Sequence, residues 1–297
     1  MKTSINKKMI ILLSIVLLGS FTIFTACKKT ETYNQFNEKN LELALDQSFS
    51  AELFDEVIEI ADEALITINT SELKTVEINP FRFLRMGECV VVTNVISLNK
   101  IVTTIDFGAV GCAGPDGRLR QGKMIITREG RYFDGEVNVT YGFENYFVNG
   151  NKLTGTKTVT GFINAAGNRQ MNIVDNGTVI LAEEAGTITR TAQHTREVIA
   201  GSNTPQKQDD IIKVTGSSTG INASGETFSS QITTALIRNN AEDCSRFYIQ
   251  GIVNIVKGDG TEITINYGDG TCDNLAEITI NGETKVVELK AHRRKIV

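Results

Sequence analysis

The 297-residue chain has no tryptophan, only three prolines and only two histidines, and its formal net charge is −5. This negative balance argues against a nucleic acid partner, because phosphate binding needs a basic surface. The chain also has no His-Glu-x-x-His and no phosphate-binding loop. The sequence therefore indicates no catalytic residues, and the enzyme class that stays an alternative is a glycoside hydrolase, which needs only two carboxylates.

The N-terminus has the layout of an export signal. A lysine-containing start is followed by an apolar run from Met9 to Phe24, which is the order found in secretory signals. The run has about 16 residues, fewer than the roughly 20 that a helix needs to cross a bilayer. We therefore expect residues 1–26 to be a signal peptide that is cleaved off.

The end of this run, Phe24-Thr-Ala-Cys27, resembles the lipobox of bacterial lipoproteins, with Phe24 where leucine is usual. The resemblance implies that Cys27 becomes the first residue and carries acyl chains such as palmitate, which anchor the protein stably when two or three are present. Lys28 implies the outer membrane, on its periplasmic face or at the cell surface. An ordinary cleaved signal is the alternative. The polar residues 27–40 predict a flexible tether.

Residues 41–75 are predicted to form a helical segment. Apolar residues recur there at three- and four-residue intervals with acidic residues between them, which is typical of one or two amphipathic helices. The apolar residues are Leu41, Leu43, Leu45, Phe49, Leu53, Val57, Ile58, Ile60 and Ala61. We expect the apolar face to pack on the sheet that follows, and a helix that binds a partner is the alternative.

Residues 76–297 are predicted to form a β domain, because short alternating runs rich in Thr, Val and Ile are separated by turn residues. Asn149-Gly150, Asn176-Gly177 and Asn281-Gly282 predict hairpin turns, since a type I′ turn needs positive φ at both central positions. The predicted fold class is mainly β: an antiparallel meander of about twelve strands that forms a sandwich or a half-closed barrel, preceded by the amphipathic helical segment.

An internal repeat divides the β domain into two similar halves, about 76–200 and 209–297. Thr104-Ile-Asp-Phe-Gly108 aligns without gaps with Thr264-Ile-Asn-Tyr-Gly268, and a cysteine follows each final glycine by four residues. A polar stretch between the halves predicts a connection, and we expect one continuous sheet system instead of two independent domains.

Four cysteines remain when Cys27 is set aside, namely Cys89, Cys112, Cys244 and Cys272. An even number in an exported protein indicates disulfides. In each half a predicted hairpin lies between the two cysteines, so that both reach the same end. We therefore predict the pairs Cys89–Cys112 and Cys244–Cys272, each contributing about 3 kcal/mol. A four-cysteine metal site is the alternative, but it lacks any Cys-x-x-Cys pair.

The order of these landmarks is similar to that in cell-envelope lipoproteins of Bacteroidota. The landmarks are the lipobox, the helix, a Gly-Cys element, the turn at Asn145–Gly150 and the stretch Tyr267–Asn274. The resemblance covers most of the chain after Cys27. It implies a location in the cell envelope and carries no known activity, so no residue role follows from it.

The stretch Tyr267–Asn274 also predicts a candidate metal site. Asp269, Asp273 and Asn274 offer hard oxygen ligands from a tight loop, which is the chemistry that calcium prefers. The first repeat has alanine at the positions of both aspartates, so a structural turn held by the disulfide is the alternative. The sequence predicts no other cofactor.

Arg190, His194 and Arg196 are predicted to share one face of a strand, because side chains alternate between faces. Arginine pairs with carboxylate, sulfate and phosphate in a bidentate way. These three residues are therefore a candidate ligand site for an anion. The alternative is a solvated face whose charge is balanced by Glu183 and Glu184.

Tyr141, Phe143 and Phe147 are predicted to share a face of the strand that ends at Asn149. Such a row can stack on sugars, but aromatic residues at this spacing usually pack in a core, and the absence of tryptophan weakens the glycan-binding interpretation. The basic tail at 290–295 could contact anionic lipid headgroups, with a frayed charged end as the alternative.

Together these observations predict a lipid-anchored cell-envelope protein that acts as a binding or structural module for a protein or glycan ligand. The first alternative is a carrier of a hydrophobic ligand in a half-barrel whose mouth the helix covers. An apolar cavity would favour the carrier, and a filled sheet interface would oppose it. The second alternative is a glycan-directed hydrolase, which requires two carboxyl groups that converge in a cleft.

Overall fold

The computed structural model describes residues 38–72, 86–97, 100–130, 136–204, 207–241 and 247–289. The predicted signal peptide, Cys27, most of the tether, Cys244 and the basic tail lie outside these ranges. No helix within them is both long and apolar enough to cross a membrane.

The described residues form one antiparallel sheet of fourteen strands and one long N-terminal helix. The strands are β1 (Val91–Ser97), β2 (Lys100–Asp106), β3 (Cys112–Ala113), β4 (Leu119–Gly130), β5 (Val137–Val148), β6 (Asn151–Ile163), β7 (Arg169–Ile180), β8 (Thr187–Ala200), β9 (Ile211–Ile221), β10 (Thr227–Asn239), β11 (Gln250–Lys257), β12 (Glu262–Asp269), β13 (Leu275–Ile280) and β14 (Glu283–Glu288). Each strand pairs with its neighbours in chain order, except that β2 pairs with β4 and the short β3 pairs only with β4.

The predicted fold class is therefore confirmed: the protein is mainly β, and an antiparallel meander follows an N-terminal helix. The sheet curls but is not closed into a barrel. It has more strands than the predicted twelve, and they form one sheet instead of the two of a sandwich. The sheet continues through the polar connection at 201–210, because β8 pairs directly with β9.

The helix α2 (Glu38–Glu72) is a single element of 35 residues. Neither glycine nor proline interrupts this stretch, which explains why one helix forms where one or two were expected. At 1.5 Å per residue its length is about 52 Å, which matches the width of about eleven strands spaced 4.8 Å apart. One helix can therefore cross most of the sheet.

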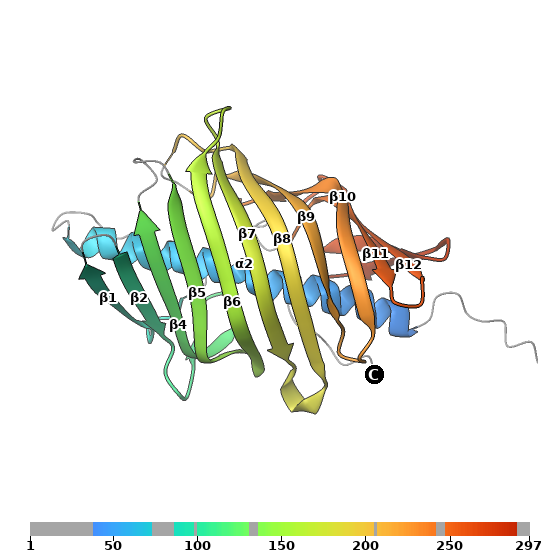
Figure 1. Ribbon diagram of the computed structural model, residues 1–297, viewed down its shortest axis with the longest axis horizontal. Coiled ribbons are helices and arrows are strands. Elements are labelled where there is room, and N and C mark those ends of the chain that lie inside the picture. Colours follow the sequence, from blue (N-terminus) through green and yellow to red (C-terminus); the bar gives the residue numbers. More distant parts are fainter. Residues whose placement is uncertain are drawn as a thin grey trace, which may run out of the picture. The chain divides into compact units, whose positions relative to one another are not determined.

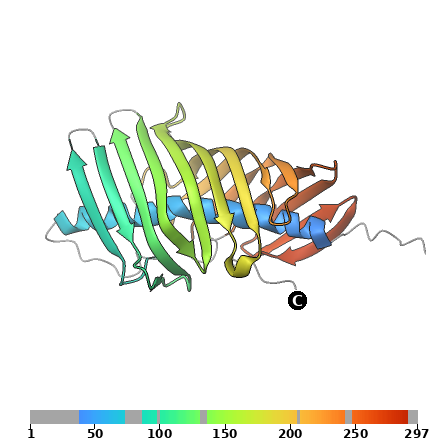
Figure 2. The ribbon, with the colours of Figure 1, turned by 60° about the horizontal axis from the view of Figure 1, so that its bottom comes forward.

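The helix lies across the strands, and the sheet curls round it (Figures 1 and 2). We call the face of the sheet toward α2 the inner face and the opposite face the outer face. Two hydrophobic clusters fill the space between helix and sheet. One joins the stretch from Phe49 to Ala64 to strands from the first half of the sheet, and the other joins Leu43 and Ala44 to strands from β9 onward.

Two of the three predicted Asn-Gly turns are confirmed. Asn149-Gly150 connects β5 to β6, and Asn281-Gly282 connects β13 to β14. Both residues of each turn have positive φ, between 50° and 86°, as a type I′ turn requires.

The third predicted turn, Asn176-Gly177, is wrong, because both residues lie inside β7. Gly177 faces α2, and a Cβ atom at this position would lie only 2.0 Å from Cζ of Phe54. The glycine therefore makes room for a helix side chain instead of reversing the chain.

The internal repeat corresponds to equivalent places in the sheet. Ile105 in β2 and Phe107 directly after it are buried on the inner face, as are Ile265 and Tyr267 in β12. The predicted hairpin of the second half is confirmed by the pairing of β11 with β12.

The predicted disulfide between Cys89 and Cys112 is confirmed, with a Cα–Cα distance of 5.7 Å. Cys272 is also disulfide-bonded. Its predicted partner, Cys244, lies outside the described residues, so that pair stays a prediction.

We expect Gly177→Ala to lower the free energy of unfolding by about 1–3 kcal/mol, because the new methyl group overlaps the buried ring of Phe54. Urea unfolding checks this. Gly142→Ala in β5 is the matched control, since a Cβ atom there meets nothing within 4 Å. Equal stability of the two variants would contradict the assigned close approach of helix and sheet.

Candidate functional site

The inner face of the sheet carries charged side chains that meet acidic side chains of α2. The acidic residues of α2 that reach the sheet or the segments beside it are Glu42, Asp46, Glu52, Asp55, Glu56, Glu59, Asp62 and Glu63. Their basic partners are Arg118, Arg120, Arg196, Lys207 and Arg238. Electrostatic attraction therefore adds to apolar packing between helix and sheet.

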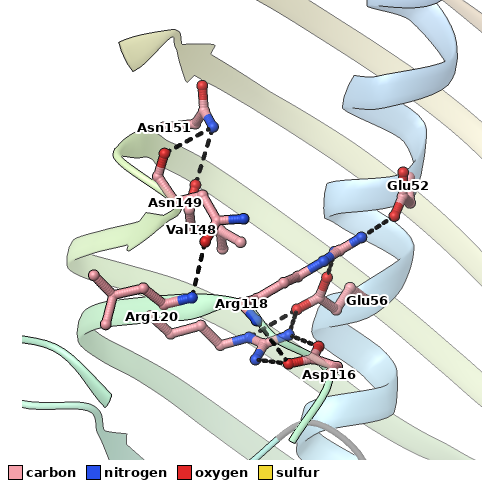
Figure 3. A network of polar contacts seen from close by, with 9 residues as sticks. Glu52, Glu56, Asp116, Arg118, Arg120, Val148, Asn149 and Asn151 are labelled. Carbon is pink, nitrogen blue, oxygen red and sulfur yellow. Dashed lines mark hydrogen bonds and ion pairs between the residues drawn. The ribbon is translucent and has the colours of Figure 1, made fainter. Parts of the chain in front are cut away.

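Arg118, just before β4, and Arg120, near its start, bind Glu56 of the helix (Figure 3). Arg118 donates to Oε2 of Glu56, and Nε of Arg120 donates to Oε1 at 2.8 Å. The two arginines reach the same carboxylate because residues two apart on an extended chain point to the same side. The side chain of Arg120 is completely buried, so this pairing is shielded from water.

Two more carboxylates complete this cluster. Asp116 accepts hydrogen bonds from Arg120 at 2.5 and 3.0 Å, and Glu52 accepts one from Arg118. Three carboxylates thus surround two guanidinium groups (Figure 3). Because the chain itself supplies the counter-charge, the cluster attaches α2 to the sheet and is not an anion site for an outside ligand.

The three predicted anion-site residues lie on the inner face of β8. Arg190 and Arg196 are buried, so the alternative of a solvated face is wrong. Glu183 and Glu184, the expected counter-charges, are exposed in the 3-10 turn η3 (Ala182–Glu184). The reason is that α2 covers this face, which the sequence of the strand alone does not reveal.

The carboxylate that Arg196 binds belongs to the helix. Arg196 donates to Oε1 of Glu59, and Arg238 of β10 donates to the same oxygen at 2.5 Å. Binding of an outside anion at these positions stays a prediction, and it requires replacement of the Glu59 carboxylate.

A second buried group of charges lies on the central strands. Nζ of Lys157 in β6 donates to Oδ1 of Asp175 in β7 at 2.8 Å, and both side chains are fully buried. Arg190 lies 3.9 Å from the other oxygen of Asp175 and donates to Ser218 at 3.5 Å. In register, Arg190 is flanked by Gly177 and by a glycine of β9, so these glycines leave space beside the long side chain.

Burial controls the protonation of His194. Burial and the nearby charge of Arg190 lower the pKa of His194 from 6.5 to about 4, although Asp55 and Asp175 act in the opposite direction. The imidazole is therefore neutral at pH 7.

Burial raises the pKa of Asp55, but the charges of Lys157 and Arg238 outweigh it, and the pKa lies below its ordinary value. Tyr248 adds a hydrogen bond of 2.7 Å to this carboxylate. Asp55 is therefore ionised beneath the sheet at neutral pH.

The three predicted calcium ligands are used in local hydrogen bonds. Asp269 accepts from the backbone and hydroxyl of Thr271, Asp273 accepts from the backbone of Leu275, and Asn274 donates to Glu288. No group of three or more His, Cys, Asp or Glu residues suited to a metal ion occurs in the described ranges. This geometry is that of a hydrogen-bonded turn, and calcium binding here stays a prediction.

The predicted aromatic row is divided by a β-bulge. Tyr141 is buried, and Phe143 packs on the hydrophobic cluster of the inner face. The register shifts between Tyr141 and Tyr146, where Asn145 has positive φ, so Phe147 turns to the outer face and Lys152 lies over its ring. The extra residue of the bulge reverses the alternation, and the shared aromatic face is wrong.

The central strands β6 to β10 present an uncharged polar surface on the outer face. Alternate residues there carry hydroxyl or amide groups, and we call these residues the outer field: Thr154, Thr156, Thr158, Thr160, Asn172, Asn176, Thr178, Thr189, Thr191, Gln193, Thr195, Thr215, Ser217, Thr219, Ser229 and Gln231. All are exposed or half-buried. Charged residues usually lie on the exposed face of a sheet and uncharged residues on the buried face. Here the exposed centre is uncharged, and charged side chains are buried on the inner face.

On the central strands β6 to β10, charged residues of the outer face lie near the strand ends, outside the field. Lys152 is near the start of β6, and Lys213 near the start of β9 forms an ion pair of 2.7 Å with Glu197 near the end of β8. The sequence alone shows a period-two threonine repeat, Thr154-x-Thr-x-Thr-x-Thr160. It does not show that the sheet register places polar residues of other strands beside this repeat.

We expect Glu56→Gln to lower the free energy of unfolding by about 3 kcal/mol, because two buried guanidinium groups lose a charged partner. Glu129→Gln is the matched control: its ion pair with Lys100 is exposed and 3.9 Å long, so the loss should be below about 0.5 kcal/mol. Urea unfolding measures both, and equal losses would contradict the role of Glu56.

We expect His194→Leu to flatten the pH dependence of stability. Because the pKa of His194 is lower in the folded state, the unfolded chain takes up the proton first as the pH falls from 6.5 to about 4. The wild-type protein therefore loses up to about 3 kcal/mol over this range, and the variant lacks this loss. Urea unfolding at several pH values tests the difference, and parallel curves would refute it.

The sequence matches no protein-family model, and it has no significant match among curated proteins or solved structures.

Proposed function

We propose that the protein is a lipid-anchored binding module of the cell envelope, with Cys27 as its anchor and the outer field as its binding surface. The single observation that carries the binding role is the exposed, uncharged outer field on the central strands. The export signal and lipobox support the location, and the long strands give a rigid support for a surface of this kind.

The inner face supports this role over that of a carrier. A hydrophobic ligand held in a half-barrel needs the hollow side of the sheet, and α2 occupies that side with two hydrophobic clusters and several ion pairs. The helix is thus an integral part of the core in this structure.

The inner face also supports binding over hydrolysis. Glu56, Glu59 and Asp175 are held by arginine or lysine side chains. A general acid needs a carboxyl group with a raised pKa near the substrate, whereas these carboxylates are paired with cations between the helix and the sheet.

The anchor is tested with the full chain and a Cys27→Ala variant expressed in a Gram-negative host. We expect the mature wild type to start at Cys27, to carry acyl chains by intact mass, and to fractionate with membranes. Cys27→Ala should lose the acyl mass and at least about tenfold of the membrane-bound fraction, since the acyl chains supply the binding energy. Unacylated wild-type protein would refute the anchor.

A further inference from the structure

We propose that the outer field binds a neutral polysaccharide by hydrogen bonding. This inference rests on the proposed function, because it names the class of ligand for the same surface. The ligand would be a polymer of uncharged sugars, and the site would be the central part of the field, on β6 to β9.

The register of the sheet arranges the field in rows that cross the strands. One row runs from Thr156 through Asn176, Thr191 and Thr219 to Ser229, each residue directly opposite the next. Neighbouring strands lie about 4.8 Å apart, and side chains on one face repeat about every 6.7 Å along a strand. The field is therefore a regular two-dimensional array.

A second row lies beside the first. It contains Thr158, Val174, Gln193, Ser217 and Gln231 in the same order of strands. A third row joins Thr160 to Asn172, Thr195 and Thr215. Together these rows present hydroxyl and amide groups over several strands, which is long enough for successive units of a polymer.

The central groups are available to a ligand. In the part of the chain that the structure describes, the side chains of Thr156, Thr158, Thr191 and Thr219 form no hydrogen bond, unlike Thr160, which donates to Asn138 at 2.8 Å. Hydroxyl and amide groups both donate and accept hydrogen bonds, as sugar hydroxyls do. Threonine is stiff at χ1, so these groups are ordered before binding and lose little entropy.

The distribution of charge favours neutral sugars over other partners. A nucleic acid, an anionic polysaccharide or a phospholipid surface needs basic residues, and the three rows contain none. The apolar residues exposed nearby, such as Val174, Ile180 and Ile221, lie singly among polar residues, whereas a hydrophobic partner needs a continuous apolar patch.

Recognition in this mode uses hydrogen bonds across an array, so it does not depend on the aromatic stacking that the lack of tryptophan disfavours. Each exposed hydrogen bond contributes little. The affinity for one sugar unit is thus expected to be low, and many anchored copies on one polymer chain would raise the apparent affinity.

The test uses the full chain in neutral detergent and measures binding to immobilised polysaccharides by surface plasmon resonance. The probes are dextran, mannan and galactan as neutral polymers and alginate as an anionic one. We expect at least one neutral polymer to bind more tightly than alginate. Thr191→Lys and Ser217→Lys should each weaken this binding about tenfold, because the lysine disrupts central contacts.

Thr93→Lys is the matched control, since Thr93 is an exposed threonine of β1 outside the field, and its binding should equal that of the wild type. Tighter binding to alginate, no binding to any neutral polymer, or an equal effect of Thr93→Lys would each overturn the inference.

A crosslinking experiment separates failure of this inference from failure of the proposed function. A photoreactive residue is placed at Thr191 or, as the control, at Thr93, in the full chain in intact cells. Crosslinks from Thr191 alone to polysaccharide support the inference. Crosslinks from Thr191 alone to a protein overturn the neutral-sugar ligand but leave the outer field as a binding surface, and crosslinks from neither position overturn both.

Discussion

The structure depends on one constraint: an open sheet with an apolar inner face must be covered, and here a single helix covers it. A sandwich meets this need with a second sheet and a barrel by closure. This chain instead places α2 across the strands and curls the sheet round it. The consequence is that helix side chains are buried on several sides, from Leu43 near one end to Ala64 near the other. The outer face is then left free to face solvent.

The ion pairs between helix and sheet add specificity more than stability, because removing two charges from water costs nearly what their attraction returns. A shift of the helix by one turn would move it about 5.4 Å along its axis. Such a shift would separate Glu56 from Arg118 and Arg120, and Glu59 from Arg196 and Arg238, which would leave charges buried without partners. The pairs thus define one position of α2 along the sheet.

Features that depend on short-range sequence patterns were predicted correctly, whereas features that depend on contacts between distant residues were not. Alternation, helical spacing, two Asn-Gly turns and the pair Cys89–Cys112 depend on residues close in the chain or on an internal repeat. The burial of Arg196 depends on Glu59, which is 137 residues away, and Gly177 resembles a turn glycine until Phe54 lies against it. The outer field was visible as a threonine repeat in β6, but only the register of five strands assembles it into an array.

The direction of α2 relative to the meander has a consequence for assembly of the protein. The first strands contact the later part of the helix, and the cluster that contains Leu43 and Ala44 uses strands from β9 to β13. The helix therefore runs opposite to the order of the strands: its first residues pack on late strands, and its later residues pack on early strands. During synthesis from the N-terminus, the first helical residues are therefore the last to find their packing partners. The hydrophobic core is complete only when the final hairpins have formed.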